Sequence, residues 1–148
     1  MKKLLVVIYI VLIINLCACG KKNKDVVEDK LKIANGVEMS IVDDSLNETG
    51  IKIIIEEKGK EHYIYDNQYE IEMYSGDKWN KISKKGNDLS KINTSKANSN
   101  RQLEYNINWE KIYGKLSRGK YRIIKNVIDE KNMTEKSELF VILEFEIK

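Results

Sequence analysis

Apolar and polar residues alternate along most of the chain after residue 35. Val37, Met39 and Ile41 are separated by polar residues, and the same period of two recurs further along. The later segments with this period are 51–55, 63–65, 69–73, 103–109, 121–127 and 139–147. A period of two is typical of a β-strand with one buried face and one solvated face.

Turn residues separate these segments, and a sustained helical period is missing from the sequence. Ser75-Gly76-Asp77 predicts a hairpin turn that leads to a return strand with Trp79 and Ile82. Residues 109–116 (WEKIYGKL) have room for one helical turn, and the polar residues 83–100 predict a long loop or a weak edge strand. About seven short alternating strands predict an all-β fold, an antiparallel β-sandwich.

The first residues have the pattern of an export signal. Lys2 and Lys3 form a basic start, and a run of roughly 13 apolar residues follows at 4–16, broken only by Asn15. A membrane-spanning helix needs about 20 apolar residues, so the run is too short for one. Its length is that of the apolar part of a signal peptide.

Leu16-Cys17-Ala18-Cys19 ends this run and resembles the lipobox of bacterial lipoproteins. In that family the thiol of the last cysteine is diacylated and the peptide bond before it is cleaved. The resemblance implies that residues 1–18 are a cleaved signal peptide. It also implies that lipid on Cys19 holds the protein to the extracytoplasmic face of the cell membrane. The alternatives are an uncleaved membrane anchor and an ordinary signal peptide with an incidental cysteine.

The sequence divides the rest of the chain in two. We expect 19–35 to be the lipidated cysteine with a charged tether, and 36–148 to be one folded domain. Lys21, Lys22 and Lys24 would lie close to anionic lipid head groups. A solvated spacer with no such role is the alternative for this segment.

The composition limits the chemistry that the domain can perform. The 148 residues suffice for one domain with a substantial core. The formal charge of +3 falls to +1 when Lys2 and Lys3 leave with the signal peptide, so no nucleic-acid partner is expected. One histidine and two cysteines argue against a zinc finger, an iron–sulfur cluster or a disulfide framework. We therefore expect no metal and no cofactor.

One strand opens with a motif that points to a family. Gly119-x-Tyr121-x-Ile123 is similar to the tyrosine corner of immunoglobulin-type sandwiches, in which a tyrosine hydroxyl bonds to backbone a few residues upstream. Ile123 would then stand where such domains carry a cysteine.

The wider context is more specific. Trp109, Tyr113-Gly114 and Leu116 precede the motif, Gly76-x-Lys78-Trp79 lies earlier, and Leu143-Glu144-Phe145-Glu146-Ile147 closes the chain. Together they resemble a bacterial Ig-like domain family of exported proteins, over roughly residues 36–148. The resemblance implies an Ig-like sandwich without enzymatic activity. Ser117 stands where the family frequently has proline.

Few residues suggest a reactive or metal site. His62 is expected to be a surface residue rather than a general base, because the sequence carries no motif for nucleophilic catalysis, and no enzyme is expected. Asp43 and Asp44 have the oxygen ligands that Ca²⁺ prefers, although acidic turn residues are common. The polar segment 83–100 is either a solvated loop or a contact for an anionic wall polymer.

Alternation also predicts which apolar residues point outward. Tyr74, Phe140 and Ile142 lie opposite the inward sets of their strands. We expect them to form a patch that binds a protein partner, since exposed aromatic residues concentrate at interfaces. A second buried face is the other interpretation. The leading function is a non-catalytic protein-interaction or scaffolding module at the cell envelope, and the alternative is binding of a wall polymer or small ligand.

Overall fold

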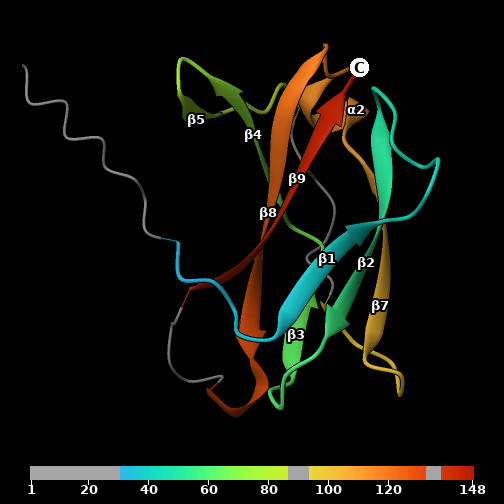
Figure 1. Ribbon diagram of the computed structural model, residues 1–148, viewed down its shortest axis with the longest axis vertical. Coiled ribbons are helices and arrows are strands. Elements are labelled where there is room, and N and C mark those ends of the chain that lie inside the picture. The colour runs from blue at the N-terminus through green and yellow to red at the C-terminus, as the bar shows by residue number, and fades with distance from the viewer. Residues whose placement is uncertain (1–30, 87–93, 133–137) are drawn as a thin grey trace, which may run out of the picture. The chain divides into compact units, whose positions relative to one another are not determined.

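The computed structural model describes residues 31–86, 94–132 and 138–148. Within these ranges the alternating segments form β-strands (Figure 1). The strands are β1 Val37–Ile41, β2 Gly50–Glu57, β3 Tyr63–Asp66, β4 Glu70–Ser75, β5 Lys78–Lys81, β6 Thr94–Lys96, β7 Gln102–Asn108, β8 Gly119–Asp129 and β9 Leu139–Ile147. Two short helical turns, α2 Glu110–Tyr113 and the 3₁₀ turn η2 Glu130–Asn132, complete the described elements.

The strands make two antiparallel sheets. One sheet has three strands in the order β1-β2-β7. The other has six strands and centres on β8, which pairs with β9 along one edge and with β4 and then β3 along the other. Short strands extend this sheet beyond β4 and β3, namely β5 and β6. The predicted all-β antiparallel sandwich is confirmed, and β6 arises within the segment that predicted a loop or weak edge.

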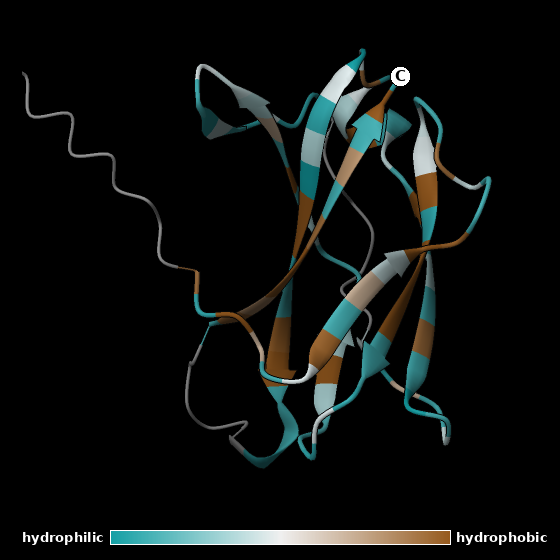
Figure 2. Ribbon diagram, viewed as in Figure 1, coloured by the Kyte–Doolittle hydropathy of each residue, from teal (hydrophilic) through white to brown (hydrophobic). Residues whose placement is uncertain are grey.

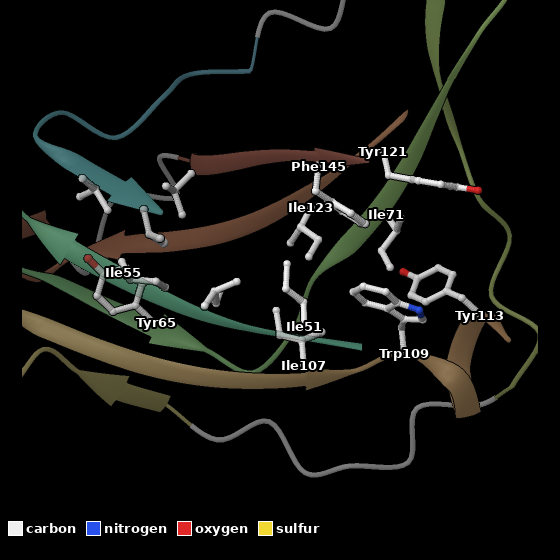
Figure 3. Packing of buried hydrophobic residues seen from close by; sticks show 14 of the residues in the cluster. Ile51, Ile55, Tyr65, Ile71, Ile107, Trp109, Tyr113, Tyr121, Ile123 and Phe145 are labelled. Atoms are coloured by element: carbon white, nitrogen blue, oxygen red, sulfur yellow. The ribbon is translucent and has the colours of Figure 1, made fainter. Parts of the chain in front are cut away.

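The core lies between the two sheets. Figure 3 shows apolar side chains from both layers, such as Ile51 and Ile123, pointing toward one another. Trp109 is fully buried and stacks on Phe145, with ring centroids 5.5 Å apart. Phe145 stacks in turn on Tyr121 at 5.6 Å. Bands of apolar and polar residues along β1, β2 and β7 in Figure 2 follow the period of two that the sequence carries.

The predicted tyrosine corner is present. The Tyr121 hydroxyl donates a hydrogen bond to the carbonyl oxygen of Ser117 at 2.8 Å, four residues upstream. Ile123, at the position of the usual cysteine, is fully buried. The Ser117 hydroxyl, which proline lacks, lies 3.3 Å from the same Tyr121 hydroxyl.

Two local predictions are also confirmed. The hairpin turn between β4 and β5 is built on Gly76 and Asp77, whose φ angles of 61° and 60° are those that a type I′ turn requires. The helical turn α2 lies inside the segment 109–116. Its first residues follow the buried Trp109, which anchors the turn to the core.

The described domain begins before the expected boundary at residue 36. Ile33 forms a parallel bridge with Phe140 of β9, and the Ala34 amide donates to the Phe140 carbonyl oxygen at 2.8 Å. Ala34 is 4% exposed and belongs to the core. Gly36 then turns the chain toward β1 with a φ of +66°, and a Cβ on it would lie 2.6 Å from the backbone of Gly59.

Candidate functional site

The outer faces of the two sheets differ in polarity. On the three-stranded sheet the outward positions of β1, β2 and β7 are polar, and Ile54 is the single large apolar side chain among these described strand residues. On the six-stranded sheet the outward positions include many apolar side chains. A solvated sheet needs polar residues on its outer face, so the six-stranded sheet is the candidate surface for a partner.

Most of these outward apolar side chains gather at one end of β8 and β9. We name this group the apolar patch, and its members are Ile33, Ile64, Ile124, Ile128, Phe140 and Ile142. Register places them side by side, since Ile124 pairs with Ile142, Ile64 with Ile128 and Ile33 with Phe140.

Exposure varies within the apolar patch. Ile33 and Ile128 are 51% and 37% exposed, whereas Ile124 is only 5% exposed. Ile124 lies on the outer face by register although it is almost fully buried, and Ile64, Phe140 and Ile142 are partly buried. The patch is therefore a packed apolar surface, and a partner would meet its more exposed members first.

A second group lies at the other end of the same face. Tyr74 of β4 is 41% exposed and meets Trp79 of β5 edge to face, with ring centroids 5.2 Å apart. The Lys120 ammonium lies 5.5 Å and 5.4 Å from the two ring centroids, and the Arg122 guanidinium lies 4.7 Å from that of Trp79. We name Tyr74 and Trp79 the aromatic cluster. The chain's own cations already occupy one side of these rings.

Ion pairs separate the two groups. Arg122 pairs with Glu72 at 2.5 Å, and Lys120 pairs with Glu144 at 2.7 Å. Tyr74 contacts Lys120, whereas Ile142 pairs with Ile124, four residues further along β8, a distance of about 13 Å at the usual rise per residue. The structure thus brings Phe140 and Ile142 together in the apolar patch and places Tyr74 elsewhere on the same face.

A buried carboxylate at one end of the sandwich has no counterpart among the sequence predictions. The Glu57 side chain is 2% exposed and accepts hydrogen bonds from the Tyr63 amide at 3.0 Å and the Tyr65 hydroxyl at 3.1 Å. Its other oxygen lies 3.2 Å from His62 Nδ1 and 3.4 Å from Arg101 Nη2. Burial, together with this carboxylate, raises the pKa of the Tyr65 hydroxyl well above its usual range.

This group joins the β2–β3 turn to the start of β7. Arg101 donates to the backbone carbonyl oxygens of Glu57, Gly59 and Glu61, each at 2.8 Å. His62, whose side chain is 54% exposed, places Nε2 3.2 Å from Arg101 Nη1. These contacts join backbone segments that lie far apart in the sequence. They explain the position of His62 without a catalytic role.

The family follows from a comparison with known proteins. A model of a bacterial Ig-like domain matches residues 34–139. The chain belongs to the bacterial Ig-like domain family. The two-sheet sandwich and the tyrosine corner agree with this family. Domains of the family are generally non-catalytic modules. No curated protein matches the sequence significantly.

Two other expectations concern metals and membranes. In residues 31–86, 94–132 and 138–148, no group of three or more acidic, histidine or cysteine side chains is placed to hold a metal ion. Asp43 and Asp44 are therefore not part of such a group. Nearby, the Asn47 side chain accepts hydrogen bonds from the Thr49 and Gly50 amides and so shapes the turn. None of the described helices is long and apolar enough to span a membrane. Cys19 and residues 87–93 of the polar segment lie outside the described residues.

The Ig-like domain also buries a lysine between its sheets. Lys125 of β8 is 1% exposed, and its ammonium donates to the backbone carbonyl oxygens of Asp66 at 2.8 Å and Gln68 at 3.1 Å. The same ammonium lies 4.4 Å from the ring centroid of Tyr105. Lys125 thus holds the connection between β3 and β4. Burial lowers its pKa from 10.5 to about 8, and the charge of Asp66 partly opposes that shift.

Stability is therefore expected to rise with pH between 8 and 10. In this interval the unfolded chain keeps the Lys125 proton, whose pKa there is near 10.5, while the folded domain has released it. The folded state then binds fewer protons, and the free energy of unfolding increases. Above pH 10 the buried tyrosines Tyr63, Tyr65 and Tyr105 oppose the trend, because their pKa values are raised on folding.

Urea unfolding at several pH values measures this slope. We expect Lys125→Met to reduce it and Lys52→Met, which removes a lysine whose side chain is 43% exposed, to leave it unchanged. An equal slope in wild type and Lys125→Met would show that Lys125 does not carry the effect.

Proposed function

We propose that this chain is a lipid-anchored, extracytoplasmic protein whose Ig-like domain binds another protein through the outer face of its six-stranded sheet. The observation that carries the proposal is the contrast between the two outer faces. One is polar except for Ile54, and the other carries the apolar patch and the aromatic cluster. Apolar side chains on the outer face of a sheet favour a protein interface, and Ile33 and Ile128 are the most exposed members of the apolar patch.

The apolar patch is the better contact surface of the two groups. Its side chains are aliphatic or aromatic, and a partner would gain free energy by removing them from water. Tyr74 and Trp79 already contact Lys120 and Arg122, and these two cations are paired with Glu144 and Glu72. Binding at the aromatic cluster would have to displace those contacts.

The anchor rests on the sequence. The basic start, the apolar run and the small residues before Cys19 agree with one another as a lipoprotein signal. Two acyl chains on one cysteine suffice for stable membrane attachment, at about 0.8 kcal/mol for each buried methylene group. An anchored domain would meet its partner at the membrane surface.

Chemical crosslinking in intact cells tests the proposed function. A tagged wild-type chain should give one dominant protein adduct, and Phe140→Ser combined with Ile142→Thr should reduce its yield about tenfold, as loss of a central interface contact does. Ile54→Thr makes a similar change on the opposite outer face and should leave the adduct unchanged. Tyr74→Ser tests the aromatic cluster separately.

Two results would count against the proposal. Equal loss of the adduct in the double variant and in Ile54→Thr would point to reduced folding rather than to an interface. A wild-type chain without any specific protein adduct would instead favour a wall polymer or small ligand as the partner.

A further inference from the structure

Within the described part of the chain, the edge of β9 that faces away from β8 is paired at its beginning. The Phe140 amide donates to the Lys32 carbonyl oxygen at 2.9 Å, and the Phe140 carbonyl oxygen accepts from Ala34. Both backbone groups of Phe140 therefore face away from β8. In an antiparallel ladder this orientation recurs at every second residue, so Ile142, Glu144 and Glu146 face the same edge.

At that edge the described residues give Ile142, Glu144 and Glu146 no backbone partner. The chain turns at Gly36 and continues as β1, which stays close to β9 but hydrogen-bonds to β2 in the other sheet. Among the described residues, no hydrogen bond reaches the edge-facing backbone groups of Ile142, Glu144 or Glu146. Open strand edges of this kind are templates for another strand.

We infer that the partner of this domain adds an extended segment to the free edge of β9, opposite Ile142, Glu144 and Glu146. The inference deepens the proposed function and rests on it, because it states how the partner protein is held. Backbone hydrogen bonds would supply affinity, and alternate side chains of the added strand would supply specificity. The parallel segment 32–34 already uses this edge in the same way.

The side chains at the edge define the chemistry of the added strand. Ile142 belongs to the apolar patch, while Glu144 and Glu146 carry negative charge on the same outer face. Opposite charges on neighbouring strands stabilise a pair, and like charges destabilise it. The segment should therefore carry an apolar residue beside Ile142 and lysine or arginine at the two alternate positions beside the glutamates.

A second copy of this chain fits the edge poorly. Two β9 strands paired antiparallel about Glu144 would place Glu144 opposite Glu144 and Ile142 opposite Glu146. The first pair repels, and the second leaves a carboxylate beside an apolar side chain. Charge complementarity thus favours a basic segment of another protein.

The other sheet offers a control edge. The Trp109 amide donates to Thr49 and the Arg101 carbonyl oxygen accepts from Glu57, so odd-numbered residues of β7 face β2. Gln102, Glu104 and Asn106 therefore face away from β2, and Asn98 contacts both backbone groups of Gln102. Their outer face is polar and gives an added strand no apolar contact. Glu104 forms an ion pair with Lys52 at 2.7 Å, just as Glu144 forms one with Lys120 at 2.7 Å. Glu104 is therefore a matched control position for Glu144.

Peptide binding to the full chain in detergent micelles tests the inference by NMR. The probes are two capped peptides, Ile-Thr-Lys-Thr-Lys and the reverse sequence Lys-Thr-Lys-Thr-Ile. In the control peptides glutamate replaces lysine. We expect a lysine peptide to protect the amides of Ile142, Glu144 and Glu146 from hydrogen exchange, and the glutamate peptides to have no effect.

Matched variants separate backbone from charge. Glu144→Pro removes an edge-facing amide and should weaken peptide binding about tenfold, whereas Glu104→Pro should leave it unchanged. Glu146→Lys keeps the backbone intact and should weaken binding by repulsion, with Glu104→Lys as its control. These charge variants answer the question even if a proline variant fails to fold.

Several outcomes overturn the inference. The first is that neither lysine peptide binds. The second is that Glu144→Pro and Glu146→Lys bind the peptide as well as their controls do. The third is that the chain associates with itself through Glu144. The proposed function fails on a different result, a chain that gives no protein adduct in cells.

Discussion

Replacing Trp109 by alanine should remove a large part of the stability of the Ig-like domain. Trp109 is fully buried, stacks on Phe145, and donates its indole hydrogen to the Glu48 carbonyl oxygen at 2.8 Å. The substitution leaves a cavity between the sheets and removes that bond, at a cost of about 3–5 kcal/mol. Domains are stable by about 5–15 kcal/mol, so the variant should unfold at a far lower denaturant concentration.

Trp79→Ala is the matched control for this prediction. It deletes the same side chain from the partly exposed outer face, where Trp79 contacts Tyr74 and Arg122. We expect a loss of about 1 kcal/mol, the usual size of an aromatic-pair contribution. Urea unfolding followed by circular dichroism measures both variants. Similar costs at the two positions would contradict the assignment of Trp109 to the centre of the core.

Replacing Cys19 by alanine should abolish incorporation of labelled fatty acid. The proposed anchor has a single acceptor thiol, the one on Cys19, so the variant has no site for the two acyl chains. The expected effect is complete loss of label. It is measured by growing cells with labelled fatty acid and isolating the tagged protein.

Cys17→Ala tests whether the position matters rather than the presence of a cysteine. Alanine is also small, so the signal should still be processed and Cys19 should still take lipid. Label that survives Cys19→Ala, or label that is lost equally in both variants, would remove the lipoprotein part of the proposed function.

The period of two predicts the fold because it depends only on neighbouring residues. Alternation identified the inward sets of β2, β8 and β9, and the Gly119-x-Tyr121 motif identified the tyrosine corner. The same parity places Tyr74, Phe140 and Ile142 on the outer face of the six-stranded sheet.

Positions across the sheet could not be predicted, because they depend on strand order and register. The sequence does not show that β4 and β9 flank the same strand, or that Tyr74 meets Lys120 while Ile142 meets Ile124. The apolar patch and the aromatic cluster therefore appeared as one group until the register separated them.

The buried charges were missed although the sequence contains a signal for them. Glu57 continues the inward series Ile51, Ile53 and Ile55, and Lys125 lies between the inward residues Ile123 and Val127. A charged residue at an inward position needs a buried partner. The distant partners were not predictable, because Arg101 lies 44 residues from Glu57 and Asp66 lies 59 residues from Lys125. The nearer partners of Glu57, such as Tyr65, depend on how the β2–β3 turn folds back.

We propose that the outer face of the six-stranded sheet meets a protein partner in the cell. Photocrosslinking from single positions tests it most directly, with a photoreactive phenylalanine analogue in place of Ile142 on that face or in place of Ile54 on the opposite one. We predict one protein adduct from position 142 and none from position 54. Adducts from position 54 alone, or equally from both positions, would contradict the claim.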